Sequence, residues 1–147
     1  MMISLNYITN DLLKRLVEYD ATVLNEPKLL SQTERIGSWT YDPLSVAILI
    51  GNRSLVDDLL VHPEVRHKAA KSDNMALRCA VEYGDFDVVS NLLLIESVRS
   101  DAAALNNEAL RIAVTKGDED IVNHLLKINT VRDNAATQGN DMLVIAA

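Results

Sequence analysis

The sequence predicts an all-α solenoid of stacked helix–turn–helix units, and three observations lead to this fold class. The 147 residues include five glycines and three prolines, too few for a sandwich or barrel with many tight turns. The chain resembles itself at a fixed period, which is typical of repeat architectures. The apolar residues of each copy follow helical spacing. Because one short helix pair cannot bury its apolar stripe alone, successive units must stack.

The internal repeat has a period of 33 residues and runs without a gap. Four leucines mark the period, namely Leu44, Leu77, Leu110 and Leu143. The same step relates other residue types, at Ala47, Ala80, Ala113 and Ala146, at Gly51, Gly84 and Gly117, at Val56, Val89 and Val122, and at Arg66, Arg99 and Arg132. Agreement at so many positions indicates one structural unit for each period.

Residues 74–106 show how one unit is expected to be built. Asn74 is expected to cap a first helix by accepting a hydrogen bond from a first-turn amide, and Gly84 to end that helix in the left-handed conformation. Asp85 is expected to cap a second helix. The apolar positions of the two helices are Leu77, Ala80, Val81, Val88, Val89, Leu92 and Leu93. The next unit repeats the pattern from Asn107.

Three segments of the repeat carry a family resemblance. Asp42–Ala47, Met75–Ala80 and Glu108–Ala113 are similar to the Thr-Pro-Leu-His-x-Ala motif of the ankyrin repeat, whose period is also 33 residues. The recurring glycine, valine and paired leucines also fall at ankyrin offsets. The resemblance covers residues 41–147. It implies an ankyrin-like helical repeat solenoid that grips a protein partner near its concave face, with no catalytic residues and no cofactor.

The chain departs from the family pattern in two ways. Ser45, Arg78 and Arg111 replace the histidine of the motif. Val-Arg-x-x-Ala-Ala segments that begin at residues 65, 98 and 131 stand where the family has Gly-Ala-Asp, and their apolar spacing suggests a short helical turn. We therefore expect loops that lack regular β-hairpins. The Asn-x-Ala-Leu-Arg-x-Ala form of the repeat resembles repeats in effector proteins of intracellular bacteria.

The two ends of the chain do not follow the full repeat. Residues 1–40 are expected to form a divergent helical N-terminal cap, with a small separate binding element as the alternative. The repeats occupy residues 41–73, 74–106 and 107–139, with a partial repeat at 140–147. An unfinished repeat exposes apolar surface. We therefore expect either a fragment of a longer protein or a homodimer formed through the incomplete C-terminal repeat.

Composition and charge argue against several classes of function. The net charge of −7 is unlike the clustered positive charge that nucleic-acid binding requires. The longest apolar run, Val46–Ile50, is far too short to cross a membrane. The single cysteine, Cys79, fits a reducing compartment, so a cytoplasmic location is expected, or secretion into a host cell for an effector. His62, His67 and His124 lack the spacing of a metal site.

Two recurring charged sets have structural explanations. Arg66, Arg99 and Arg132 are expected to satisfy carbonyl groups at helix ends or to pair with acids, and an anion-binding strip is the alternative. The acidic sets are expected to begin the second helices, where negative charge suits the helix dipole. These sets are Asp57 and Asp58, Asp85 and Asp87, and Asp118, Glu119 and Asp120.

Function in such a solenoid is expected at positions that vary between units while the framework repeats. The candidate partner-binding residues are Trp39, Tyr41, Arg78, Glu82, Tyr83, Arg111, Thr115 and Lys116. Aromatic and arginine side chains are frequent interface anchors, although Trp39 has packing against the first repeat as its alternative role. The sequence thus predicts a protein–protein interaction module, and the resemblance to effector repeats suggests the ankyrin part of a bacterial effector that binds a host protein. The alternatives are the targeting fragment of a larger enzyme and a self-associating structural module.

Overall fold

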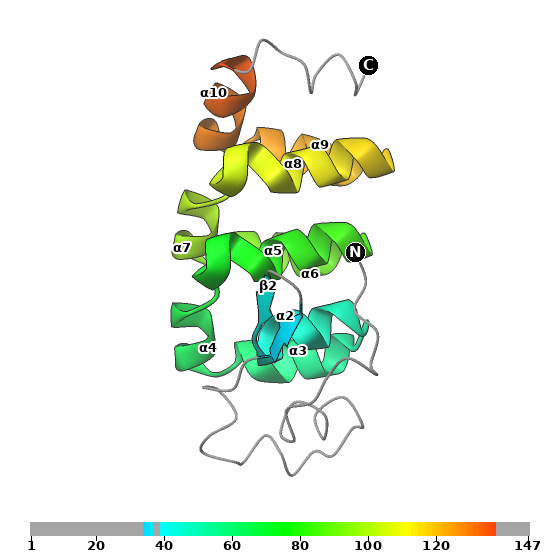
Figure 1. Cartoon of the computed structure of the whole chain (residues 1–147), viewed down its shortest axis with the longest axis vertical. Helices are drawn as coiled ribbons and strands as arrows, with labels where there is room; N and C mark the ends of the chain where they lie inside the picture. Colours follow the sequence, from blue (N-terminus) through cyan, green and yellow to red (C-terminus); the bar gives the residue numbers. More distant parts are fainter. Residues whose placement is uncertain (1–33, 37–38, 138–147) are drawn as a thin grey trace. The chain divides into compact units, whose positions relative to one another are not determined.

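The computed structural model describes residues 34–36 and 39–137 (Figure 1). The chain divides into two compact units, Met1–Lys68 and Ala69–Ala147. In both units the described part of the repeats is helical, as the sequence predicts, and the strands that the structure describes lie before the first repeat helix.

The first unit contains a short β-hairpin followed by three helices. Its described elements are β1 (Glu34–Ile36), β2 (Trp39–Tyr41), α2 (Pro43–Leu49), α3 (Arg53–Leu60) and α4 (Pro63–His67). The two strands are antiparallel, with Ile36 opposite Trp39 and Glu34 opposite Tyr41. The second strand leads directly into α2, the first helix of the first repeat.

The helices of the first unit begin at side-chain caps. The Ser45 amide donates to Oδ1 of Asp42 at 2.8 Å, and the Asp42 amide donates to Oγ of Ser45 at 2.9 Å, which forms a capping box. Asn52 starts α3 by accepting from the amide three residues on, at 3.0 Å. Asp57 and Asp58 lie in the second half of α3, so the expectation that they begin the helix is wrong.

The second unit contains two complete copies of a three-helix repeat. Its described helices are α5 (Lys71–Tyr83), α6 (Phe86–Leu93), α7 (Glu96–Ser100), α8 (Ala104–Lys116), α9 (Glu119–Leu126) and α10 (Asn129–Thr137). The long first helices α5 and α8 pack against each other, and so do the second helices α6 and α9 (Figure 1). Helix α10 packs against both α8 and α9. Each copy therefore buries its apolar stripe against its neighbour.

The turns inside each copy follow the expected helix signals. Gly84 and Gly117 end α5 and α8 in the left-handed conformation, with φ values of 85° and 72°. Asp85 and Asp118 start α6 and α9, and each accepts from the amide three residues on at 3.2 Å. The predicted glycine and aspartate caps are confirmed.

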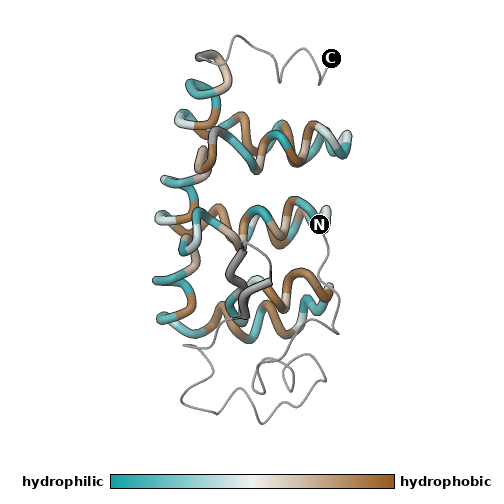
Figure 2. Tube along the Cα trace, viewed as in Figure 1, coloured by the Kyte–Doolittle hydropathy of each residue, from teal (hydrophilic) through white to brown (hydrophobic). Residues whose placement is uncertain are grey.

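The core of the second unit is the repeated apolar stripe. Leu77 and Ala80 of α5 are fully buried, as are Leu92 of α6, Ala113 of α8 and Leu125 of α9. Each of these helices alternates apolar and polar residues along its length (Figure 2). Alanine on the first helices leaves room for α5 and α8 to lie side by side, because a larger side chain there would overfill the interface.

Short helices follow the second helices, in place of regular hairpins. The valine of each Val-Arg pair is buried, as at Val98 and Val131. The arginine that follows donates Nη1 to the carbonyl of the last residue of the preceding helix. The three donor–acceptor distances are 2.9 Å for Arg66 to Leu60, 3.3 Å for Arg99 to Leu93 and 3.4 Å for Arg132 to Leu126. The predicted helical loops and the structural explanation of the arginines are confirmed.

The expected N-cap role of Asn74 and Asn107 is wrong. Ser72, Asp73 and Asn74 have φ values of 56°, 55° and 61°, so they form a left-handed turn at the start of α5. The Asn74 side chain is buried and donates Nδ2 to the carbonyl of residue 98 at 2.8 Å. Asn107, with φ 63°, makes the same bond to the carbonyl of residue 131 at 2.8 Å. Asparagine tolerates the left-handed region better than most residues, and it donates the same buried hydrogen bond in both copies. These two properties, and not capping, explain its recurrence.

The hairpin corrects part of the expected N-terminal cap. Glu34–Ile36 and Trp39–Tyr41 are strands, where the sequence suggested a helical cap over residues 1–40. Trp, Thr and Tyr favour extended backbone, whereas Ser72–Asn74, one period later, favour a turn. Residues 1–33 and the partial repeat at 140–147 lie outside the described residues, so the remaining expectations about the two ends stay predictions.

Candidate partner-binding surfaces

One candidate surface lies on the first helices of the second unit. Five side chains form what we name the helix-end face: Glu82, Tyr83, Arg111, Thr115 and Lys116. Helices α5 and α8 run side by side in the same direction, so positions one period apart lie next to each other (Figure 1). Glu82 and Thr115 are therefore equivalent positions on the two packed helices, and so are Tyr83 and Lys116. Glu82 is half-buried and the other four residues are exposed.

The helix-end face combines an aromatic ring with cationic groups. Tyr83 keeps 43% of its surface exposed, so a large part of its ring is available to a partner. Arg111 lies one turn before Thr115 on α8 and forms a loose ion pair with Glu108, at 4.0 Å. The two side chains of that pair are 54% and 36% exposed, so solvent screens the interaction and a partner carboxylate can compete for Arg111.

Arg78 occupies a different environment from its counterpart Arg111. Its residue exposure is 6%. Nε donates to the carbonyl of Asp73 at 2.9 Å, and Nη2 donates to the carbonyl of Ser72 at 2.8 Å. The guanidinium thus satisfies the left-handed turn that starts α5. We therefore leave Arg78 out of the helix-end face, although the sequence places it among the candidate residues.

Trp39 and Tyr41 lie on β2 of the first unit. Their backbone pairing is described, but their side chains lie outside the described part of the structure. Their role in partner binding therefore stays a prediction from the sequence.

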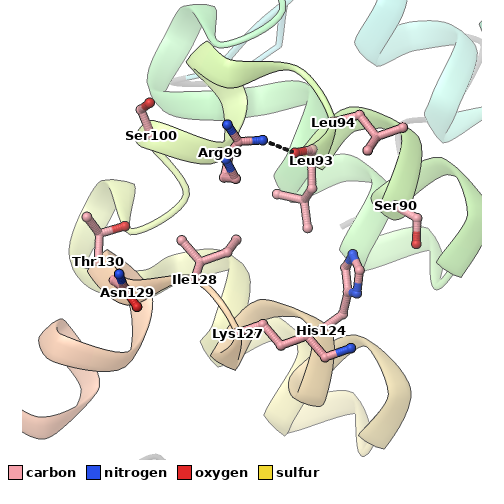
Figure 3. Close-up of a pocket in the computed structure, with 10 residues that line it drawn as sticks. All are labelled: Ser90, Leu93, Leu94, Arg99, Ser100, His124, Lys127, Ile128, Asn129 and Thr130. Atoms are coloured by element: carbon pink, nitrogen blue, oxygen red, sulfur yellow. Dashed lines mark hydrogen bonds between the residues drawn. The ribbon is translucent and has the colours of Figure 1, made fainter.

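A second candidate surface is a groove that the sequence did not single out. It has a volume of about 580 Å³ and lies where the ends of α6 and α9 meet α7 and α10 (Figure 3). Its apolar lining includes Leu93, Leu94 and Ile128, and its basic lining includes Arg99 and Lys127. The pattern that would have revealed it is the difference between Leu94 and Lys127, which occupy equivalent positions in successive repeats.

Three further observations concern the cysteine, possible metal ligands and the length of the helices in the described residues. Cys79 is buried at 5% exposure. No group of three or more His, Cys, Asp or Glu residues within 34–36 and 39–137 has an arrangement that could hold a metal ion. Of the helices that the structure describes, none has the length and apolar character needed to cross a membrane.

The stacked copies and their recurring buried contacts define a helical repeat protein. The family model of ankyrin repeats, in three copies, matches residues 44–137, which is more than half of the chain. The chain belongs to the ankyrin repeat family. Repeats of this family are in general protein–protein interaction modules and are typically non-catalytic. No curated protein and no solved structure matches the chain.

Proposed function

We propose that the protein binds a protein partner through the helix-end face of α5 and α8. The observation that carries this proposal is the exposure of non-recurring side chains on a recurring frame. Tyr83 and Lys116 occupy equivalent positions in successive repeats and are both exposed, whereas Leu77 and Leu110 recur and are both buried. The frame holds the variable positions at fixed spacing, so they can present a specific pattern to a partner.

The chemistry of this face favours a partner with an apolar patch bordered by acidic groups. Tyr83 offers a rigid ring with a hydroxyl group, which combines contact area with a polar contact. Lys116 and Arg111 are exposed cations that would meet carboxylates at the rim of the interface. We expect most of the binding energy at Tyr83, because aromatic residues dominate interface hot spots.

Site-specific photocross-linking tests the proposed face. A photoreactive phenylalanine analogue at position 83 should cross-link a captured protein, and the same analogue at position 71, exposed at the other end of α5, should not. The partner found in this way is then purified, and its affinity for variants is measured by calorimetry. Tyr83→Ser and Lys116→Glu should each weaken binding by about tenfold or more.

A matched charge reversal provides the control. Lys71→Glu makes the same charge change on an exposed residue at the other end of α5, and it should leave the affinity within about twofold. Equal losses for Lys71→Glu and Lys116→Glu would refute the proposed face. Concentration-dependent self-association that uses position 83 would instead favour the structural-module alternative.

The resemblance to effector repeats supports a narrower form of the proposal, in which the partner is a host protein. Its support is the Asn-x-Ala-Leu-Arg-x-Ala motif at residues 74–80 and 107–113. A translocation reporter fused to the chain would test it, and failure of transfer from a bacterium into host cells would remove this narrower form only.

A further inference from the structure

The groove between the two copies of the second unit has the size and lining of a ligand site. Its volume of about 580 Å³ falls within the usual range for such sites, about 300–1,000 Å³. Leu93 and Ile128 supply apolar surface, and Leu94 stands at the edge with 78% of its surface exposed. A bound segment that covers Leu94 would remove a large apolar surface from water.

The polar lining of the groove selects the charge of its ligand. Arg99 and Lys127 are cationic, and among the described lining residues none is Asp or Glu. Lys127 forms no ion pair with any residue that the structure describes. Arg99 uses one N–H group on the Leu93 carbonyl and keeps its other donors. Anionic groups therefore fit this lining, whereas a basic segment would meet two like charges.

The net charge of the chain does not cancel this local preference. The chain carries −7, but charges beyond about 8 Å are largely screened at physiological ionic strength. The groove's own two cations therefore govern the electrostatic interaction at close range. Raising the salt concentration should weaken it.

Two residues of the groove lining differ from their counterparts one period earlier. Lys127 stands where the previous copy has Leu94, and His124 stands where it has Asn91. By contrast, Arg99 recurs in every copy, because it holds the end of the preceding helix. The His124 ring packs edge-on against Phe86, with 5.4 Å between the ring centroids, so its change also serves packing. Lys127 is exposed and adds a cation where the previous copy is apolar, which favours a binding role.

We propose that the groove binds an acidic, extended peptide segment of a protein partner. A large apolar side chain of the segment packs over Leu93 and Ile128 beside Leu94. Flanking carboxylates meet Lys127 and the free donors of Arg99, and the His124 ring lies in the wall between α6 and α9 (Figure 3). This surface differs in residues and helices from the helix-end face, so neither proposal depends on the other.

The test uses a defined peptide and two matched protein variants. The probe is fluorescein-labelled EDLEFDE, amidated at its C-terminus, and its binding to the full chain is followed by fluorescence polarisation. Peptides EDSESDE and KKLKFKK remove the apolar side chains and invert the charge. Lys127→Glu reverses a groove charge, and Lys71→Glu makes the same change on an exposed residue of α5 that belongs to neither surface. Far-UV circular dichroism confirms that the variants are folded.

The expected result is specific in both charge and place. EDLEFDE binds, and each control peptide binds about tenfold more weakly or not at all. Lys127→Glu weakens binding by about tenfold or more, whereas Lys71→Glu leaves it within about twofold. Leu94→Ser weakens binding as well. In ¹H–¹⁵N spectra, the amides of Leu94, Lys127 and Ile128 shift with added peptide.

Four outcomes would overturn the proposal. The first is no binding of EDLEFDE at about 1 mM, and the second is a KKLKFKK affinity equal to that of EDLEFDE. The third is an equal loss of affinity for the two lysine variants, and the fourth is amide shifts confined to the helix-end face. A fifth is the same amide shifts on raising the protein concentration without peptide, which would make a second copy of the chain the occupant. Cross-linking at position 83 is a separate measurement with a different ligand, so the groove proposal can fail while the proposal for the helix-end face stands.

Discussion

Replacing Asn107 by aspartate should destabilise the fold by an amount that depends strongly on pH. Asn107 is 0% exposed and donates Nδ2 to the carbonyl of Val131 at 2.8 Å. The substitution keeps the shape of the side chain and its tolerance of the left-handed conformation. It replaces the donor by a carboxylate oxygen that faces another oxygen, so the ionised form loses the bond and is buried without a partner.

The magnitude follows from proton linkage. An unfolded aspartate has a pKa of about 3.9, and burial raises the pKa of the new carboxyl in the folded state. The folded chain can therefore remain protonated at pH 7, about three units above the unfolded pKa. Each unit is worth about 1.4 kcal/mol, so the penalty reaches about 4 kcal/mol at pH 7. Near pH 4 it should fall to about 1 kcal/mol or less, because the protonated carboxyl can donate to the same carbonyl.

Urea denaturation followed by circular dichroism measures this difference against the unsubstituted chain at pH 4, 5.5 and 7. The sign is fixed, because a group whose pKa is raised in the folded state loses its stabilising contribution as pH rises. Asn123→Asp on the exposed side of α9 makes the same charge change and should shift the free energy of unfolding by about 0.5 kcal/mol or less at each pH. A penalty for Asn107→Asp that is small or equal at all three pH values would refute the assigned hydrogen bond.

Three further substitutions test other parts of the frame. Gly117→Ala should cost about 1–2 kcal/mol from its left-handed backbone alone, since nothing lies within 4 Å of the added Cβ; an unchanged urea midpoint would contradict this. Ala113→Leu should cost about 1–3 kcal/mol by overfilling the contact of α8, and a more stable variant in thermal unfolding would reveal unfilled space there. Arg78→Lys should cost about 1–2 kcal/mol in urea unfolding, because a single ammonium group cannot reproduce two fixed guanidinium hydrogen bonds. The same change at exposed Arg111 should leave the free energy of unfolding nearly unchanged. Equal effects of the two substitutions would count against the role assigned to Arg78.

The frame of this protein was predictable because its signals act locally. Gly84, Asp85 and the apolar stripe act through backbone conformation, capping and helical spacing within a few residues, and the structure follows them. The role of Asn74 does not follow from local signals, because its hydrogen-bond partner lies 24 residues away and because a cap and a left-handed turn favour the same residue type. The strands at residues 34–36 and 39–41 do not follow from the helical spacing of residues 12–30, because their signal is the aromatic and β-branched residues that come after it.

The candidate sites were harder to predict because the same residue type makes different contacts at equivalent positions of successive repeats. Arg78 is buried against two carbonyl groups, whereas Arg111 is exposed, and the period alone treats them as equal. The groove depends on the ends of α6 and α9 meeting at one junction, which no single copy of the repeat contains. Such a site arises from stacking and becomes visible only when the copies are placed side by side.

A recurring frame therefore gives a rule for separating structure from function within one chain. Side chains that recur with the same contact, such as Arg66, Arg99 and Arg132, are explained by that contact and need no ligand. Side chains that change from copy to copy on exposed parts of the same frame are free of that constraint, and Tyr83 and Lys127 are of this kind. Arg99 belongs to both groups, because one N–H group holds the helix end and the others face the groove. For that reason charge reversal at Lys127, and not loss of Arg99, separates binding from folding.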